Sequence, residues 1–199
     1  MNIHTFFNSS QFFRIIIVKV ILTFAILFPS ETHGQTIGSS TIVINASIPQ
    51  IALIDIEPQG NANIHFMVAS TLEAGTQGNG ATITNNTLWL NYTNSRLQNG
   101  PFRNVMVEAA GTIPAGISLQ VQASPRSGGC GKGVFGTPSG TVTLSNSPQV
   151  LISGIGGSHT GDGPGCGHNL TYTLRVTNFE LLRHSQNNNL QITYTLADN

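Results

Sequence analysis

Apolar and polar residues alternate with a period of two along most of the chain. This alternation is typical of β-strands that bury one face and solvate the other. It is clearest in Ile117–Ala123, where apolar and polar side chains take turns almost without exception. The runs that fit this pattern are 41–46, 50–56, 63–68, 87–93, 102–108, 117–123, 140–144, 149–153, 169–176 and 190–196.

Turn-forming residues separate these runs at short intervals. Prolines at positions 49, 58, 101, 114, 125, 138 and 148 stand between runs or at their ends, with Gly and Asn nearby. Many short strands divided by such signals are typical of an antiparallel sandwich or barrel. No stretch keeps a helical period, and 179–183 suits a single helical turn at most. The pattern predicts an all-β fold: one antiparallel β-sandwich domain, Ig-like or pilin-like, over residues 35–199.

The last run is predicted to be part of the sandwich rather than a loose tail. Its apolar and polar residues alternate strictly over Leu190–Leu196. A strand with this pattern has one face to bury. We therefore expect it to pair within the domain.

The N-terminal residues differ from the rest and resemble an export signal. Arg14 and Lys19 precede an apolar run, Val20–Phe28, and a polar stretch ends at the small residue Gly34. A basic flank, a short apolar core and a small residue at the cut are the features of a secretory signal peptide. The alternative is a membrane anchor, but the run falls short of the roughly 20 apolar residues that a span needs. We expect 1–34 to be a signal peptide, with cleavage before Gln35 and no membrane span in the mature chain.

Charge is scarce and balanced. Eight Lys and Arg match eight Asp and Glu, and charged residues make up 8% of the chain, against about 25% in an average soluble protein. Nucleic-acid binding needs clustered Lys and Arg, so no nucleic-acid partner is expected. Solubility must come from Asn, Gln, Ser and Thr.

Two cysteines, Cys130 and Cys166, lie in glycine-rich stretches of the exported part. In an oxidising compartment an even number of cysteines indicates a disulfide, and such loops have few side chains with which to hold a shape. The alternative is a metal site that adds His159 and His168. Zinc ligands usually come in pairs spaced as in C-x2-C, whereas Cys166 and His168 have one residue between them and His159 stands seven before Cys166. We expect the disulfide, with no metal and no cofactor.

Two weaker candidates for chemistry lie near the second cysteine. The stretch 158–162 holds Ser, His and Asp, but triad residues normally converge from separate segments. Asp162 is a candidate calcium ligand, which would need further oxygen ligands. The fold would have to bring the carboxylates of Asp55 and Glu57 close to Asp162 to supply those ligands. We do not expect an enzyme.

Aromatic residues suggest a third kind of site. Trp89 and Tyr92 are possible glycan contacts, with Asn91 and Asn94 beside them. The two aromatic residues are three positions apart, so on a regular strand they face opposite sides. We therefore expect Trp89 to lie in the core rather than to bind a glycan.

Several short motifs resemble uncharacterised secreted β-sandwich proteins of Bacteroidota. They are the stretches 88–93, 154–156, 160–163, 167–174 and 192–199. The resemblance implies export and a sandwich fold, without an activity. The chain is also distantly similar to fimbrial subunits in its export signal, neutral polar sandwich, single disulfide and C-terminal strand. Its cysteines lie later than those of chaperone–usher pilins, so the sequence alone does not predict assembly by strand donation.

These observations predict an exported structural or adhesive component of the surface, similar to a pilus subunit. A carbohydrate-binding module is the alternative. The expected partners are other surface subunits or glycans, and the expected location is the periplasm, the cell surface or the medium. A subunit should show an edge groove for a partner's strand, a glycan binder exposed coplanar aromatic rings, and an enzyme a pocket of converging titratable groups.

Overall fold

The computed structural model describes residues 40–58, 62–68, 74–75, 82–126, 129–184 and 189–199. The expected signal peptide, 1–34, lies outside this part. The chain divides into two units, Met1–Ala46 and Ser47–Asn199. In the described ranges, no helix has the length and apolar character needed to cross a membrane.

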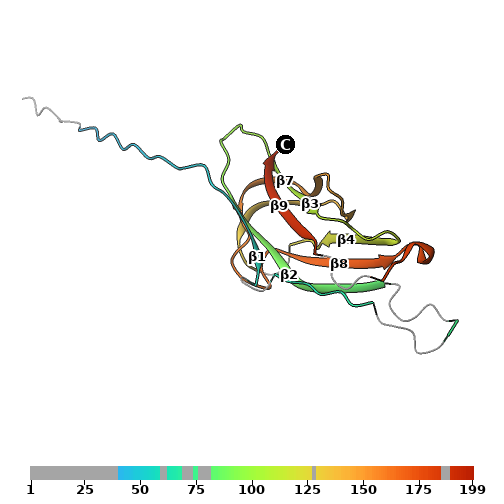
Figure 1. The fold of residues 1–199 in the computed structure, drawn as a ribbon. Coiled ribbons are helices and arrows are strands. Elements are labelled where there is room, and N and C mark those ends of the chain that lie inside the picture. The colour runs from blue at the N-terminus through green and yellow to red at the C-terminus, as the bar shows by residue number, and fades with distance from the viewer. Residues whose placement is uncertain (1–39, 59–61, 69–73, 76–81, 127–128, 185–188) are drawn as a thin grey trace, which may run out of the picture. The chain divides into compact units, whose positions relative to one another are not determined.

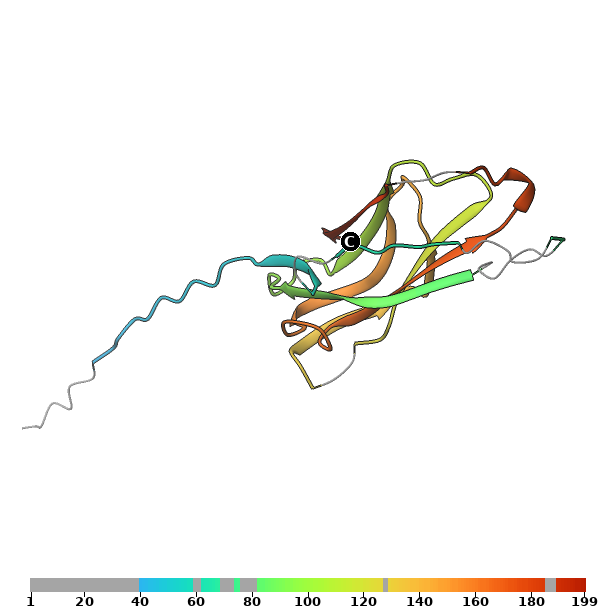
Figure 2. The same cartoon turned by 60° about the horizontal axis from the view of Figure 1, so that its bottom comes forward.

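The Ser47–Asn199 unit is an all-β, antiparallel sandwich (Figures 1 and 2). A short 3-10 helix, η1 (Phe179–Leu181), precedes the last strand. The strands are β1 (Ala52–Glu57), β2 (Thr82–Asn94), β3 (Arg103–Ala110), β4 (Ile117–Ala123), β5 (Lys132–Pro138), β6 (Thr141–Thr143), β7 (Gln149–His159), β8 (His168–Val176) and β9 (Gln191–Asp198).

One layer has the order β6-β4-β8-β2, and the other contains β7, β3 and β9 with β5 on the far side of β7. The two layers join through β2. Its first part pairs with β8, and its last residues, Thr93 and Asn94, pair with His159 and Ser158 at the end of β7. The second half of β2 also pairs with β1 over that strand's whole length.

The core lies between the layers. Its fully buried apolar side chains come from β2, β3, β4, β7 and β8 and include Leu90, Val105, Val121, Leu151, Ile152, Ile155 and Leu170. The alternation seen in the sequence explains this directly, because every second residue of a strand points to the same face. At the largest scale, the predicted antiparallel sandwich is confirmed.

Most of the predicted strands are present, with ends shifted by a few residues, and 117–123 matches β4 at both ends. The closing run forms β9, which pairs with β3 along its length, as expected. The predicted helical turn is η1. Two predicted strands are wrong: 41–46 and 63–68 form none. One strand was missed, β5, since its glycines and proline resemble a loop.

Candidate functional site

The Cys130–Cys166 disulfide is present, with its sulfur atoms 2.06 Å apart. This confirms the predicted pairing and excludes the alternative metal site, because both thiolates are used. Gly161 lies against the bridge with a φ of +96°, and a Cβ there would stand 2.7 Å from the Cβ of Cys130. Glycine is therefore required at this position. No group of three or more metal-binding side chains occurs in the described part of the chain.

A buried polar pair, Tyr92 and His168, lies close to the bridge. Tyr92 is 3% exposed and His168 is fully buried, and their rings stack. His168 Nδ1 donates to the carbonyl of Ser124 at 2.8 Å, since a carbonyl only accepts. The Tyr92 hydroxyl lies within reach of the Phe135 carbonyl and is 3.1 Å from His168 Nε2. Burial lowers the pKa of His168, so the ring is neutral at neutral pH and leaves Nε2 as an acceptor.

The two possible glycan contacts have opposite surroundings. Tyr92 belongs to the apolar core cluster, so its ring is not available to stack on a sugar. Trp89 points to the other face of β2 and is only half-buried. The expectation that Trp89 is the core residue is therefore wrong, because Tyr92 shares a face with Leu88 and Leu90 and Trp89 does not. The structure does not bring the two rings together at the surface.

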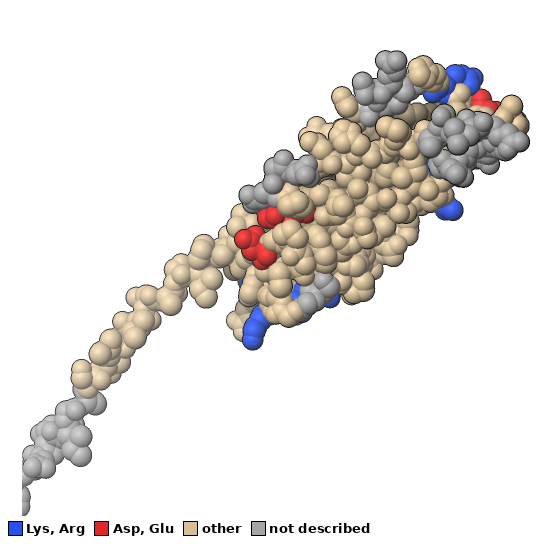
Figure 3. Space-filling view, turned by 90° about the horizontal axis from the view of Figure 1, so that it is seen from below, with Lys and Arg blue, Asp and Glu red and all other residues tan. Residues whose placement is uncertain are grey.

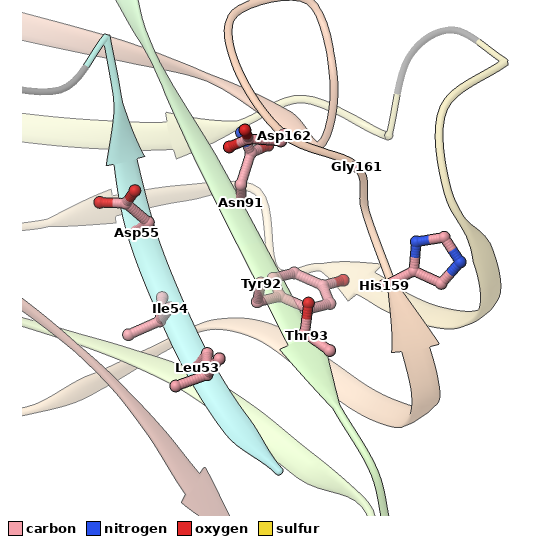
Figure 4. Close-up of a pocket in the computed structure, with 9 residues that line it drawn as sticks. All are labelled: Leu53, Ile54, Asp55, Asn91, Tyr92, Thr93, His159, Gly161 and Asp162. Atoms are coloured by element: carbon pink, nitrogen blue, oxygen red, sulfur yellow. The ribbon is translucent and has the colours of Figure 1, made fainter.

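The acids considered for calcium partly converge. Asp55 and Asp162 line one shallow pocket with Asn91 and His159 (Figure 4). Asp55 is opposite Asn91 in the β1–β2 ladder, and Asn91 Nδ2 donates to the carbonyl of Gly163 at 3.0 Å. The Asn91 Oδ1 atom is buried and has no hydrogen-bond partner in the described residues. Glu57 is buried at the end of β1 and does not line this pocket.

The hydrolase-like residues at 158–162 do not form a triad. Ser158 and His159 are neighbours on β7 and therefore point to opposite faces. The Ser158 hydroxyl donates to the Gly156 carbonyl, 3.2 Å away, instead of to a histidine. Asp162 follows in the exposed loop. This arrangement offers no activated nucleophile.

The most unusual surface of the sandwich is the flank between β1 and β9, called the open flank below. In the described residues β1 pairs only with β2, and β9 pairs only with β3. A groove runs between these two unpaired edges. It is lined by Ile54, Asp55, Ile56, Ala62, Gln191, Ile192, Thr193 and Tyr194.

Apolar side chains along the open flank are only partly buried. Ile54, Ile56, Ile192 and Leu196 pack against the core but keep some exposure, and so do Ile64 and Phe66 from the segment 62–68. The Tyr194 hydroxyl forms a hydrogen bond with that of Tyr172 on β8, at a distance of 2.5 Å. Burial raises the pKa of Tyr172 to about 12, so the pair stays uncharged. The core is thus less well covered here than elsewhere.

A second unusual feature precedes β1. The segment 41–48, called the N-terminal segment below, forms no strand although its sequence alternates. Ile42, Ile44 and Ile48 are 82%, 85% and 84% exposed. Side chains this apolar are seldom left this exposed in a regular spacing on a folded domain. Sequence reasoning recognised the strand pattern but could not show that the strand lacks a partner.

The chain between the N-terminal segment and β1 is firmly held. Ser95 Oγ donates to the Pro49 carbonyl at 3.0 Å and accepts from the Ile51 amide at 2.6 Å. The Ser95 amide donates to the Ile51 carbonyl at 2.9 Å, and Arg103 Nη1 reaches the same carbonyl at 3.2 Å. Arg103 is itself fixed by Asp198 at 2.8 Å. One backbone bond thus extends the β1–β2 pairing to Ile51, and the Ser95 side chain ties Pro49 to the same place.

Comparison with known proteins gives no relative. No family model, no curated protein and no solved structure matches the chain.

Proposed function

We propose that the protein is an exported, non-catalytic structural or adhesive component of the cell surface, which assembles like a pilus subunit through its N-terminal segment. The observation that carries the proposal is the exposure of Ile42, Ile44 and Ile48 in a strand-patterned segment that pairs with no strand among the described residues. A single strand is not stable in water and needs a sheet to join. The N-terminal segment has the sequence pattern of such a strand, so we expect it to need an acceptor sheet.

The energetic reason for assembly is apolar burial. Fully burying a side chain such as Ile contributes about 1.5–3 kcal/mol. Ile42, Ile44 and Ile48 share one face of an extended segment, so a single groove can receive all three. An acceptor sheet would also satisfy backbone groups of the segment, which form no ladder in the structure.

The surface chemistry is compatible with close packing of copies. Of the eight positive and eight negative side chains, Arg14, Lys19 and Glu31 lie in the expected signal peptide, so the mature chain carries six positive and seven negative ones, a formal net charge of −1. The face in Figure 3 carries few charged side chains. A net charge near zero favours association, because copies do not repel one another.

The test compares the mature chain, residues 35–199, with two variants by light scattering after size exclusion. Ile42→Asp with Ile44→Asp places charges on the apolar face of the segment. Thr41→Asp with Asn45→Asp adds the same charge to the opposite face and serves as the control. We expect oligomers for the mature chain and for the control, and monomers for the apolar-face variant. If all three proteins stay monomeric at the highest concentration reached, the proposal is wrong.

A further inference from the structure

We propose that the N-terminal segment of one copy adds as a strand to the free edge of β9 in a second copy, and fills the groove between β9 and β1. This inference rests on the proposed function and names the partner and its acceptor site. The partner is another molecule of the same chain, and the site is the open flank.

The β9 edge is suited to accept a strand. It is eight residues long, contains no proline and no Lys or Arg, and has one unpaired side in the described structure. The N-terminal segment also has eight residues, so the two match in length at about 3.3 Å per residue. A long, unprotected edge strand is a template for pairing with another chain.

Two other sheet edges are protected. Next to β7, β5 has Lys132 at one end, Pro138 at the other and a register shift between Gly133 and Phe135. Next to β4, β6 is only three residues long. Charge, proline, irregular pairing and shortness are the features that prevent strand addition at a sheet edge. β9 has none of them along most of its length, which favours it over β5 and β6 as the acceptor.

The apolar faces of donor and acceptor are complementary. Ile42, Ile44, Ala46 and Ile48 lie on one face of the extended segment. The groove presents the half-buried side chains Ile54, Ile56, Ile192 and Tyr194. A strand inserted with its isoleucines inward would complete the core of the open flank and would bury its own exposed side chains at the same time.

A second copy is favoured over folding back within one chain. The bonds from Ser95 to Pro49 and Ile51 tie the chain just before β1 to the end of β2. To reach its own groove, the segment would have to reverse within residues 47–50, Ser-Ile-Pro-Gln. Tight hairpin turns need residues with positive φ, usually Gly or Asn, and this stretch has neither. Donation to a neighbour needs no reversal.

Hydrogen–deuterium exchange of the assembled mature chain tests the site. The reference is the monomeric Ile42→Asp, Ile44→Asp variant. We expect amide exchange to slow by about tenfold or more in the N-terminal segment and in β9, because both gain ladder hydrogen bonds. The amides of β5 and β6 should exchange equally fast in both proteins. Slower exchange at β5 or β6, with β9 unchanged, overturns the inference.

Two further variants test the acceptor from its own side. Thr193→Lys puts a charge into the groove on β9, and Thr141→Lys puts one on the exposed edge strand β6. We expect the first to abolish oligomers and the second to leave them intact. Oligomers that depend on Ile42 and Ile44 but survive Thr193→Lys, with β9 exchange unchanged, contradict strand addition at β9 and leave the proposed function standing. Absence of any assembly by the mature chain contradicts the proposed function itself.

Discussion

Two regions of this sandwich differ in how fully their side chains are buried and their strands are paired. At the bridged end, the Cys130–Cys166 disulfide lies close to Tyr92 and His168, both of which are buried and hydrogen-bonded. At the open flank, β1 and β9 each have one edge that pairs with no strand among the described residues, and apolar residues such as Ile56 and Ile192 are only partly buried. One region is thus cross-linked by a covalent bond, whereas the other has sheet edges that pair with no strand among the described residues.

The comparison separates a region that a covalent bond stabilises from a region that we propose binds a partner. A disulfide stabilises a fold mainly by restricting the unfolded chain, wherever the bridge lies. It does nothing to cover an apolar groove. The open flank can be completed only by more protein, and the same sequence carries an exposed apolar segment, 41–48. Incomplete packing at β9 is therefore consistent with the binding surface that we propose.

The largest expected contrast comes from truncating one side chain in each region. Leu170→Ala removes a fully buried side chain of the core. We expect it to lower the free energy of unfolding by about 2–5 kcal/mol. Ile192→Ala acts on a half-buried side chain, so in the monomer we expect less than about 2 kcal/mol. Urea unfolding of both variants, in the monomeric Ile42→Asp, Ile44→Asp background, measures this.

Equal losses for the two variants would show that the open flank is packed as tightly as the core. In that case the groove would not need a partner, and the comparison between the two regions would fail.

Removing the disulfide should have the next largest effect. We expect Cys130→Ser with Cys166→Ser to destabilise the protein by about 2–4 kcal/mol, because the unfolded chain regains the freedom of the closed loop. The assembly should persist if the variant folds, because the bridge does not line the groove. Unfolding curves and light scattering of the same preparation separate the two results. Loss of assembly from a folded variant would link the bridged end to the open flank.

Most of the fold could be predicted from the sequence because period-two alternation has a direct physical cause. Strands such as β4 and β9 were found because each second side chain enters the core. β5 was missed since its sequence, Lys-Gly-Val-Phe-Gly-Thr-Pro, carries almost no apolar alternation. Its strand geometry comes from pairing with β7, a contact distant in sequence. Local pattern cannot contain that information.

The candidate site was less predictable than the fold. The alternation at 41–46 predicts a strand whether its acceptor is in the same chain or in another one. Only the three-dimensional arrangement shows that β9 and β1 have free edges and that Ile42 and Ile44 are exposed. The orientation of Trp89 and Tyr92 was likewise ambiguous, since opposite faces follow from their spacing but the buried one does not. The disulfide was predictable because an expected export signal and an even cysteine count leave few alternatives.

The smallest expected effect is a loss of stability in mild acid that comes from the bridged end. Burial holds the pKa of His168 below the ordinary value of 6.5, with Arg126 nearby also lowering it and the hydrogen bond to Ser124 opposing. The unfolded chain therefore binds a proton more readily than the folded one. Stability from this group is complete above pH 6.5 and falls as the pH drops below it, by at most about 1.4 kcal/mol per pH unit.

Urea unfolding between pH 7.5 and 5.5 should show this slope in the mature chain and in a His159→Gln control, which alters an exposed histidine. The slope should be smaller in His168→Asn, whose amide can replace the donor at Nδ1 but takes up no proton. A slope that is unchanged in a folded His168→Asn protein would assign the acid sensitivity to other groups. Because His168 does not line the groove, assembly through β9 should not follow this titration. The coupling is tested by following oligomer dissociation over the same pH range. If the oligomers dissociate as the pH falls and the His168→Asn substitution removes this dependence, the bridged end and the open flank are coupled rather than independent.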